Sequence, residues 1–258
     1  MQDLATLVQA HEDIYRSFTG LVRDLADDEW DRTTGCPGWT VRDQVAHVVS
    51  LEALLAGEPF PSDHQLPDGL PHVRDEVGRF MEVLVDVRRG RSAADLVAEL
   101  EDVFVRRRDQ LARHTDIAEE APSLLGGTQP LFRTLPIRVT DLYSHEQDVR
   151  RAVQRPGHVT GPAPEVTVDR FGKGLAATLP ERVDAEATVR FEIDGEPGRT
   201  VTVELGSGGG ALLRLPVTVA QFVALGGGRS DAPGVDDLDV DGDRELARRV
   251  LAACGLTP

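Results

Sequence analysis

The hydrophobic periodicity of this chain changes once, near residue 157, and that change limits the folds open to it. Before this point, apolar residues recur mostly at three- and four-residue steps, as in an amphipathic helix. The first stripe of this kind contains Leu4, Leu7, Ile14 and Phe18. The pattern predicts four principal helices and a shorter one, joined by uneven loops, at residues 4–25, 40–56, 73–87, 93–112 and 137–153. Such a set is typical of a four-helix bundle.

After Arg155-Pro156-Gly157 the pattern becomes that of an α+β domain. Residues 189–193 and 201–205 alternate apolar with polar side chains, which predicts two strands paired as an antiparallel hairpin. The other expected elements are a third strand at residues 211–215 and helices at 165–178, after Thr218 and at 243–253. The predicted fold class is therefore α+β, with a four-helix bundle over residues 1–156 and a smaller α+β domain over residues 157–258.

The glycine-rich stretch at residues 206–210 superficially resembles a nucleotide-binding loop. It follows a predicted strand, but Ala211 to Pro216 continue as another strand and not as a helix. Without a helix N-terminus the loop has no phosphate cradle. We therefore expect a hairpin turn there.

Composition excludes several classes of protein. The net charge of -16 argues against a general binder of nucleic acids or anionic membranes, because both are polyanions. No apolar run approaches the length of a membrane span, and residues 1–10 lack a signal-peptide pattern. The two cysteines, Cys36 and Cys254, suggest no disulfide framework. These features predict a cytoplasmic protein, and we expect a monomer.

The most informative polar pattern lies in the last helix of the predicted bundle. Asp141, His145 and Asp148 stand at i, i+4 and i+7 and so share one face of the helix. With His47 from the second helix, Asp141 and His145 would form a metal site of two nitrogens and one oxygen, with room for an outside ligand. The ordinary alternatives are a solvated acidic face and, for His47, a packed and hydrogen-bonded histidine.

The remaining candidates have simpler explanations. Cys36 precedes a helix N-terminus but has no local base, so we interpret it as structural, and we interpret Trp39 as packing at the helix entrance. No role is assigned to the histidines without partners at ligand spacing, which are His11, His64, His72, His114 and His158.

The segment Cys36-Pro37-Gly38-Trp39-Thr40-Val41-Arg42-Asp43, followed by His47 and later by His145-x-x-Asp148, resembles the mycothiol-dependent maleylpyruvate isomerase family. That family belongs to the wider DinB/YfiT-like group of metal-binding helical bundles. The resemblance spans the whole chain and implies a DinB-like four-helix bundle that binds a divalent metal, usually zinc, followed by a smaller α+β domain.

The same resemblance implies roles for individual residues. His47 and His145 match the family's histidine ligands, while Asp141 stands where the isomerase has a glutamate and many relatives have a histidine. Because aspartate is one methylene shorter, either the helix must come closer or a water must bridge to the metal. Asp148 would orient a ligand without touching the metal, and Arg229, after three glycines, would be the functional arginine of the C-terminal domain.

The implied activity is that of a metal-dependent, mycothiol-dependent enzyme acting on a small electrophile. In an isomerase, the thiolate adds to a conjugated cis double bond, allows rotation and leaves; in an S-transferase it stays attached. One alternative is a non-catalytic metal- or ligand-binding protein that keeps the fold with a degraded site. A purely structural helical protein is another. The arginine-rich composition, with Lys173 as the only lysine, fits an actinobacterial source, where mycothiol would occur.

Overall fold

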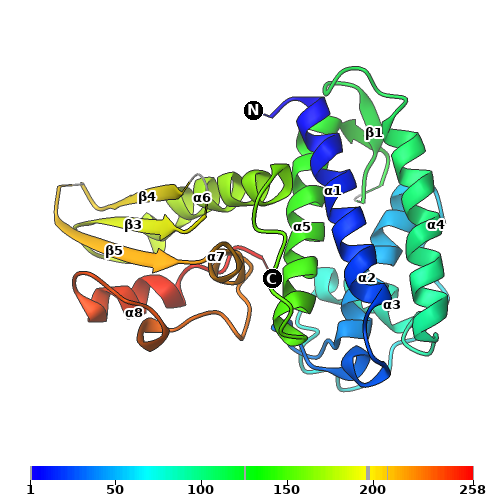
Figure 1. Ribbon diagram of the computed structural model, residues 1–258, viewed down its shortest axis with the longest axis horizontal. Helices are drawn as coiled ribbons and strands as arrows, with labels where there is room; N and C mark the ends of the chain where they lie inside the picture. The colour runs from blue at the N-terminus through cyan, green and yellow to red at the C-terminus, as the bar shows by residue number, and fades with distance from the viewer. Residues whose placement is uncertain (1, 125, 196–197, 208, 258) are drawn as a thin grey trace. The chain divides into compact units, whose positions relative to one another are not determined.

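A computed structural model describes residues 2–124, 126–195, 198–207 and 209–257. The chain forms two compact units, Met1–Gly157 and His158–Pro258. The first is mainly helical with one small two-stranded sheet, and the second combines a three-stranded sheet with helices (Figure 1). The α+β fold class is confirmed.

The helices of the first unit are α1 Leu4–Arg23, α2 Val41–Leu55, α3 Glu76–Asp86, α4 Ala93–Leu111 and α5 Leu131–Ala152, with a short 3-10 helix at Asp27–Asp31. Helix α1 packs on α4 and α5, and α2 packs on the same two helices, which gives a ring of four. The shorter α3 lies against α2. The four long helices and one shorter helix predicted from the sequence are therefore confirmed.

Helix α2 begins where its sequence dictates. The Thr40 side chain accepts the backbone N–H of Asp43, and the Asp43 carboxylate accepts the N–H of Thr40 at 2.9 Å, forming a capping box. Apolar residues such as Val41, Val45, Val48 and Val49 are fully buried. The helix ends before Gly57, which has φ +100°.

Helix α5 begins six residues before the predicted start at 137. Residues 122–136 carry helix-breaking residues, which predict a connection before the last helix, yet they include the strand β2 Thr128–Pro130, which pairs with β1 Glu120–Pro122, and the first turns of α5. Pro136 lies inside α5 and removes one backbone hydrogen bond from its second turn. Burial of Leu131 and Leu135, both nearly inaccessible, favours the longer helix despite this cost.

The second unit contains α6 Pro162–Arg182, β3 Ala187–Ile193, β4 Arg199–Leu205, β5 Ala211–Val217, α7 Val219–Gly226 and α8 Arg244–Ala252, with a 3-10 turn at Val235–Asp237. The β3–β4 hairpin is antiparallel, as predicted, with Val189 opposite Val203. Helix α6 packs on β4 and α7, while α8 packs on β5. Helix α6 is longer than predicted, because Pro162 is compatible with its first turn.

The expectation that residues 206–210 form a hairpin turn between neighbouring strands is wrong. The strand order is β4-β3-β5, and β5 runs parallel to β3. The connection from β4 therefore passes the start of β3. At Gly210 this connection lies so close to the backbone of Glu186 that an ideal Cβ would be 1.9 Å from the Glu186 carbonyl oxygen. Only glycine fits there.

We expect Gly210→Ala to lower the free energy of unfolding by at least about 2 kcal/mol, because the backbone must move to admit the methyl group. Gly20→Ala is a control for which the opposite effect on stability is expected. Gly20 is exposed within α1 with nothing within 4 Å of an ideal Cβ, so alanine there should stabilise the protein by about 1 kcal/mol. Scanning calorimetry of both variants measures the two effects, and an unchanged melting temperature for Gly210→Ala would contradict the crossing geometry.

Candidate functional site

Helices α2 and α5 of the first unit present the candidate ligands. His47 lies in the middle of α2, whose start is set by the Thr40 capping box. Asp141 and His145 stand one turn apart on α5, which packs directly against α2. Most of the polar stripe of α5 is withdrawn from solvent, because His145 and Asp148 are no more than 5% exposed, while the Asp141 side chain is 31% exposed.

The structure brings His47, Asp141 and His145 together. Nε2 of His47 lies 3.5 Å from Oδ2 of Asp141, and Nε2 of His145 lies 3.5 Å from Oδ1 of the same carboxylate. The two imidazole ring centres are 4.4 Å apart. One donor atom from each residue falls within 4.8 Å of the others, which is close enough for one cation to contact all three after small adjustments.

The electrostatics of the three groups differ sharply. Burial, reinforced by the charge of His145, lowers the pKa of His47 to about 4. Burial would raise the pKa of Asp141, but Arg138 and His145 hold that pKa well below its usual range. Burial would also lower the pKa of His145, yet Asp141 keeps it well above its usual value. The site therefore combines a neutral imidazole with a carboxylate that stays ionised.

Both ring nitrogens of His47 are buried and have no hydrogen-bond partner among the described residues. Buried polar atoms are nearly always paired, so this exception requires an explanation. A lone-pair nitrogen beside a carboxylate and a second imidazole is a suitable ligand for a cation. The residues present therefore fit a divalent metal.

Two charged residues that the sequence interpretation missed lie behind Asp141: Arg138 binds its carboxylate, and Glu52 binds Arg138. Arg138 donates from Nη1 to Oδ2 of Asp141 at 2.6 Å and from Nε to Oε1 of Glu52 at 2.9 Å. Glu52 is completely buried and also accepts from Arg107 at 2.9 Å, with Nε2 of His11 3.0 Å away. Two sequence features could have identified these residues. Glu52 is the single glutamate in the apolar run of α2, and Arg138 stands three residues before Asp141.

The other ring nitrogen of His145 faces a second polar group. Nδ1 contacts Oε1 of Gln44 and lies 3.4 Å from Oδ2 of Asp148. Asp148 therefore lies beside His145, as its proposed orienting role requires. Gln44, one turn before His47 on α2, was not singled out from the sequence. Cys36, His145 and Asp148 form an alternative set of donors for a metal ion.

Trp39 forms one wall of the site and does more than pack at the helix entrance. Its ring centre lies 5.0 Å from that of His47 and 6.0 Å from that of His145. Its indole N–H donates to Glu82 at 2.9 Å, which fixes the ring. His72 lies 3.0 Å from the same carboxylate oxygen, so the loop between α2 and α3 is tied to this wall.

Arg229 belongs to the second unit. Its guanidinium Nη1 donates to the Gly227 carbonyl at 2.8 Å and lies 3.3 Å from the Thr257 hydroxyl. These contacts place the side chain beside the turn that follows α7.

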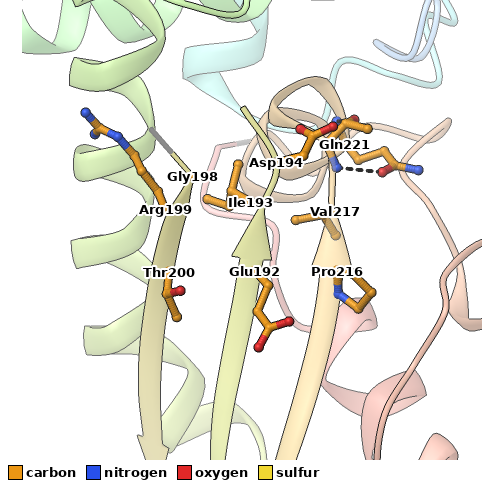
Figure 2. A pocket seen from close by; sticks show the side chains of 10 residues that line it. Glu192, Ile193, Asp194, Gly198, Arg199, Thr200, Pro216, Val217 and Gln221 are labelled. Atoms are coloured by element: carbon orange, nitrogen blue, oxygen red, sulfur yellow. Dashed lines mark hydrogen bonds between the residues drawn. The ribbon is translucent and has the colours of Figure 1, made fainter. Parts of the chain in front are cut away.

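The second unit also contains an open hollow of about 510 Å³ at the ends of β3, β4 and β5 (Figure 2). Its polar groups have local partners. Gln221 accepts the N–H of Thr218 at 2.8 Å, and Asp194 accepts that of Val219 at 3.2 Å. Arg199 and Glu165 form an ion pair at 3.2 Å. We assign no chemistry to this hollow.

The two cysteines should differ in reactivity. Cys254 is fully buried, and burial raises the pKa of its thiol to about 12, whereas Cys36 is half-buried beside Asp148. We expect iodoacetamide at pH 8 to alkylate Cys36 in the native protein and to leave Cys254 intact until the chain unfolds. Peptide mass spectrometry measures both sites, with Cys36→Ser as the control. Comparable native labelling of Cys254 would contradict its burial.

Comparisons with known proteins identify the fold and the family of the chain. The chain matches two crystal structures of mycothiol-dependent maleylpyruvate isomerase, one of them a histidine-to-alanine mutant, with TM-scores of 0.58 and 0.60. Both matches have 15% sequence identity and cover 93% of each chain, so they show a shared fold. No curated protein matches the sequence. No helix within the described residues could cross a membrane.

The sequence profile described as the mycothiol maleylpyruvate isomerase N-terminal domain matches residues 11–150, which is more than half of the chain and contains all three candidate ligands. The resemblance first suggested by the motif around Trp39 is thereby confirmed. The chain belongs to the mycothiol maleylpyruvate isomerase family.

Proposed function

We propose that this protein is a metal-dependent enzyme that uses mycothiol, and that His47, Asp141 and His145 hold the metal. The observation that carries the proposal is the close approach of these side chains around a buried His47 whose ring nitrogens lack hydrogen-bond partners among the described residues. Zinc is the preferred metal, because catalytic zinc is commonly held by two histidines and one carboxylate with an open position. Nickel, manganese or iron would also suit such donors.

A divalent cation in this site would lower the pKa of a coordinating thiol, ordinarily near 8.5, and so supply a thiolate at neutral pH. The chain's own residues have separate roles. His47 and His145 present ring nitrogens, and Arg138 holds the Asp141 carboxylate in place. The Trp39 ring shields the histidines from water on one side. Asp148 would help to orient His145.

The substrate would be a small electrophile, and two reaction types are open. A cis-trans isomerase regenerates its thiol after each turnover, whereas an S-transferase consumes one thiol per product. The protein would act as a cytoplasmic monomer, in a compartment where thiols stay reduced.

We propose that Arg229 binds a carboxylate of the substrate, since a guanidinium can bind a carboxylate with two parallel hydrogen bonds. Arg229→Met is expected to raise KM about 10- to 100-fold, corresponding to the loss of a charge-assisted contact. Arg229→Lys keeps the charge and should raise KM less. Steady-state kinetics with the zinc-loaded variants test this, and an unchanged KM for Arg229→Met would exclude the role.

The function itself is tested by metal analysis followed by a substrate screen. Freshly purified protein is analysed by inductively coupled plasma mass spectrometry beside His145→Ala. The zinc-loaded protein is then incubated with mycothiol and maleylpyruvate, or with other small electrophiles, while product and free thiol are both measured. A trans product without thiol loss identifies an isomerase, and stoichiometric thiol loss identifies a transferase.

A non-catalytic binding protein is the second candidate. It is favoured by the 2.6 Å hydrogen bond from Arg138 to Asp141, because the guanidinium offsets the negative charge of the carboxylate and so weakens its attraction for a metal ion. Calorimetric binding of mycothiol to the zinc-loaded protein, with no turnover of any electrophile, would support this alternative. Zinc-dependent turnover would exclude it.

A further inference from the structure

The backbone of the turn that contains Cys36 and Trp39 has no part in the reaction proposed above, yet a chain of hydrogen bonds joins it to His145. The chain begins at the Trp39 backbone carbonyl, which can only accept. The Thr34 hydroxyl donates its single hydrogen to this oxygen at 3.0 Å, and the Thr34 backbone N–H donates to the same oxygen at 3.1 Å. The oxygen of Thr34 is then an acceptor for its other neighbours.

Gln44 is the next link, and its amide orientation follows from Thr34. One end of the Gln44 amide lies 2.8 Å from the Thr34 oxygen. Because that oxygen is an acceptor, the NH₂ group of Gln44 must face it. The carbonyl oxygen of the amide therefore faces Nδ1 of His145. Gln44 is completely buried, so water does not compete for either end.

A carbonyl oxygen against a ring nitrogen requires a hydrogen on that nitrogen. Nδ1 of His145 therefore carries a hydrogen, and Asp148, 3.4 Å from Nδ1, favours the same state. Nε2 lies on the opposite side of the ring, 3.5 Å from Asp141. Nε2 therefore faces Asp141 and His47, and it is the nitrogen that would give up its hydrogen to bind a cation there.

We propose that Gln44 and Thr34 are positioning residues that determine which nitrogen of His145 serves as a ligand. The inference deepens the proposed function and rests on it insofar as His145 binds a metal. The turn then has a role of its own. Its backbone carbonyl orients the Thr34 hydroxyl, which orients the Gln44 amide, which in turn orients the His145 ring. The backbone N–H of Cys36 also donates to the Thr34 oxygen at 3.3 Å and helps to hold the hydroxyl in this orientation. We call this series, from the Trp39 carbonyl through Thr34 and Gln44 to His145, the relay.

The test compares substitutions that keep or remove one link. Gln44→Leu removes both ends of the amide, whereas Gln44→Glu keeps an acceptor for Nδ1. Thr34→Val removes the hydroxyl with little change in shape, and Thr34→Ser restores it. The neighbouring exposed Thr33 offers a matched control, Thr33→Val. Loss of such outer partners typically weakens metal binding 10- to 100-fold.

Two measurements are made on the full-length variants. Zinc affinity is determined by competition with a chromogenic chelator. The state of the His145 ring is read from two-bond proton–nitrogen NMR spectra of ¹⁵N-labelled protein, with His145→Gln used to assign the signals. We expect zinc on Nε2 and hydrogen on Nδ1 in the wild type, Thr33→Val and Thr34→Ser. Gln44→Leu should bind zinc 10- to 100-fold more weakly and show a second population bound through Nδ1. Thr34→Val should shift in the same direction, and Gln44→Glu should keep the wild-type ring state.

Zinc on Nδ1 in the wild type would overturn the proposal. So would wild-type affinity and ring state in Gln44→Leu. Asp148→Asn is made for comparison, and an effect confined to this variant would assign the role to Asp148 and overturn the proposal. If neither the wild type nor any variant binds zinc, the proposed function fails. The hydrogen bond from His145 to Gln44 is then tested in the metal-free protein. There, the relay requires a slowly exchanging Nδ1 hydrogen on His145 that disappears in Gln44→Leu. Its absence from the wild type would refute the relay.

Discussion

Replacing His47 with alanine is expected to abolish metal binding and thiol-dependent activity while leaving the metal-free fold intact. His47 is 3% exposed and has no hydrogen bond to lose among the described residues, so the metal-free protein gives up ring packing against Trp39 and His145 and the 3.5 Å approach of Nε2 to Asp141. Of the three proposed ligands, only Asp141 and His145 remain. We expect a loss of at least about 1,000-fold in zinc affinity, or about 4 kcal/mol.

Three measurements check this result. Mass spectrometry should find about one zinc per wild-type chain and almost none in His47→Ala. Excess zinc should raise the free energy of unfolding of the wild type, by about 4 kcal/mol when zinc exceeds its Kd about 1,000-fold, as measured by thermal unfolding. It should not raise that of the variant. His114→Ala is the matched control, because His114 pairs with Glu119 away from the ligand set. A His47→Ala protein that keeps zinc and activity would refute the assignment.

The same experiment distinguishes the two possible donor sets. If the metal used Cys36, His145 and Asp148, then Cys36→Ser would lose zinc and His47→Ala would retain it. Our assignment requires the reverse. His145→Ala cannot decide, since His145 belongs to both sets.

The largest expected effect on stability comes from Glu52. Its carboxylate joins all four long helices of the bundle through His11 on α1, Arg107 on α4 and Arg138 on α5. Glu52→Ala would leave two buried guanidinium groups without their carboxylate, and breaking a buried pair of this kind costs about 3–5 kcal/mol. Glu52→Gln keeps the shape and one acceptor but loses the charge, so it should cost less than alanine and still far more than a surface substitution.

Tryptophan fluorescence during urea unfolding measures this effect selectively. Both tryptophans, Trp30 and Trp39, lie in the first unit, so the signal does not report unfolding of the second. The matched control is Glu101→Gln, which breaks the exposed interhelical pair of Glu101 with Arg23 and should cost less than about 1 kcal/mol. Equal losses for Glu52→Gln and Glu101→Gln would contradict the central role of Glu52. Should Glu52→Ala fail to fold, Glu52→Gln still provides the comparison.

The pH dependence of the Glu52 contribution has a definite sign. Burial would raise the pKa of Glu52, but Arg107, Arg138 and His11 hold it well below its ordinary value of 4.5. The carboxylate is therefore more acidic in the folded than in the unfolded state, and its stabilisation is present above pH 4.5. The stability difference between wild type and Glu52→Gln should stay constant from about pH 6 to 8 and shrink as the pH falls below 4.5.

Where the sequence interpretation succeeded, the structure-forming signals were local. Thr40 and Asp43 are three residues apart and cap α2 by themselves, so its start was predictable. The alternation in β3 and β4 likewise follows from residues within each strand. The prediction failed at α5, where Pro136 indicates a break locally but burial of Leu131 and Leu135 favours a longer helix. It failed again at residues 206–210, since strand order depends on contacts between segments.

The sequence by itself determined the helix and strand periods, the caps, the placement of Asp141 and His145 on one face, and the motif by which the family is recognised. Only the tertiary structure decided which groups meet across helices. Gln44 reaches His145 over 101 positions of the chain, and Arg138 reaches Glu52 over 86. No local pattern encodes such pairings, because they depend on how α2 and α5 pack and on which polar groups are then withdrawn from water. That burial leaves the His47 nitrogens without partners among the described residues and makes the site a candidate for a metal.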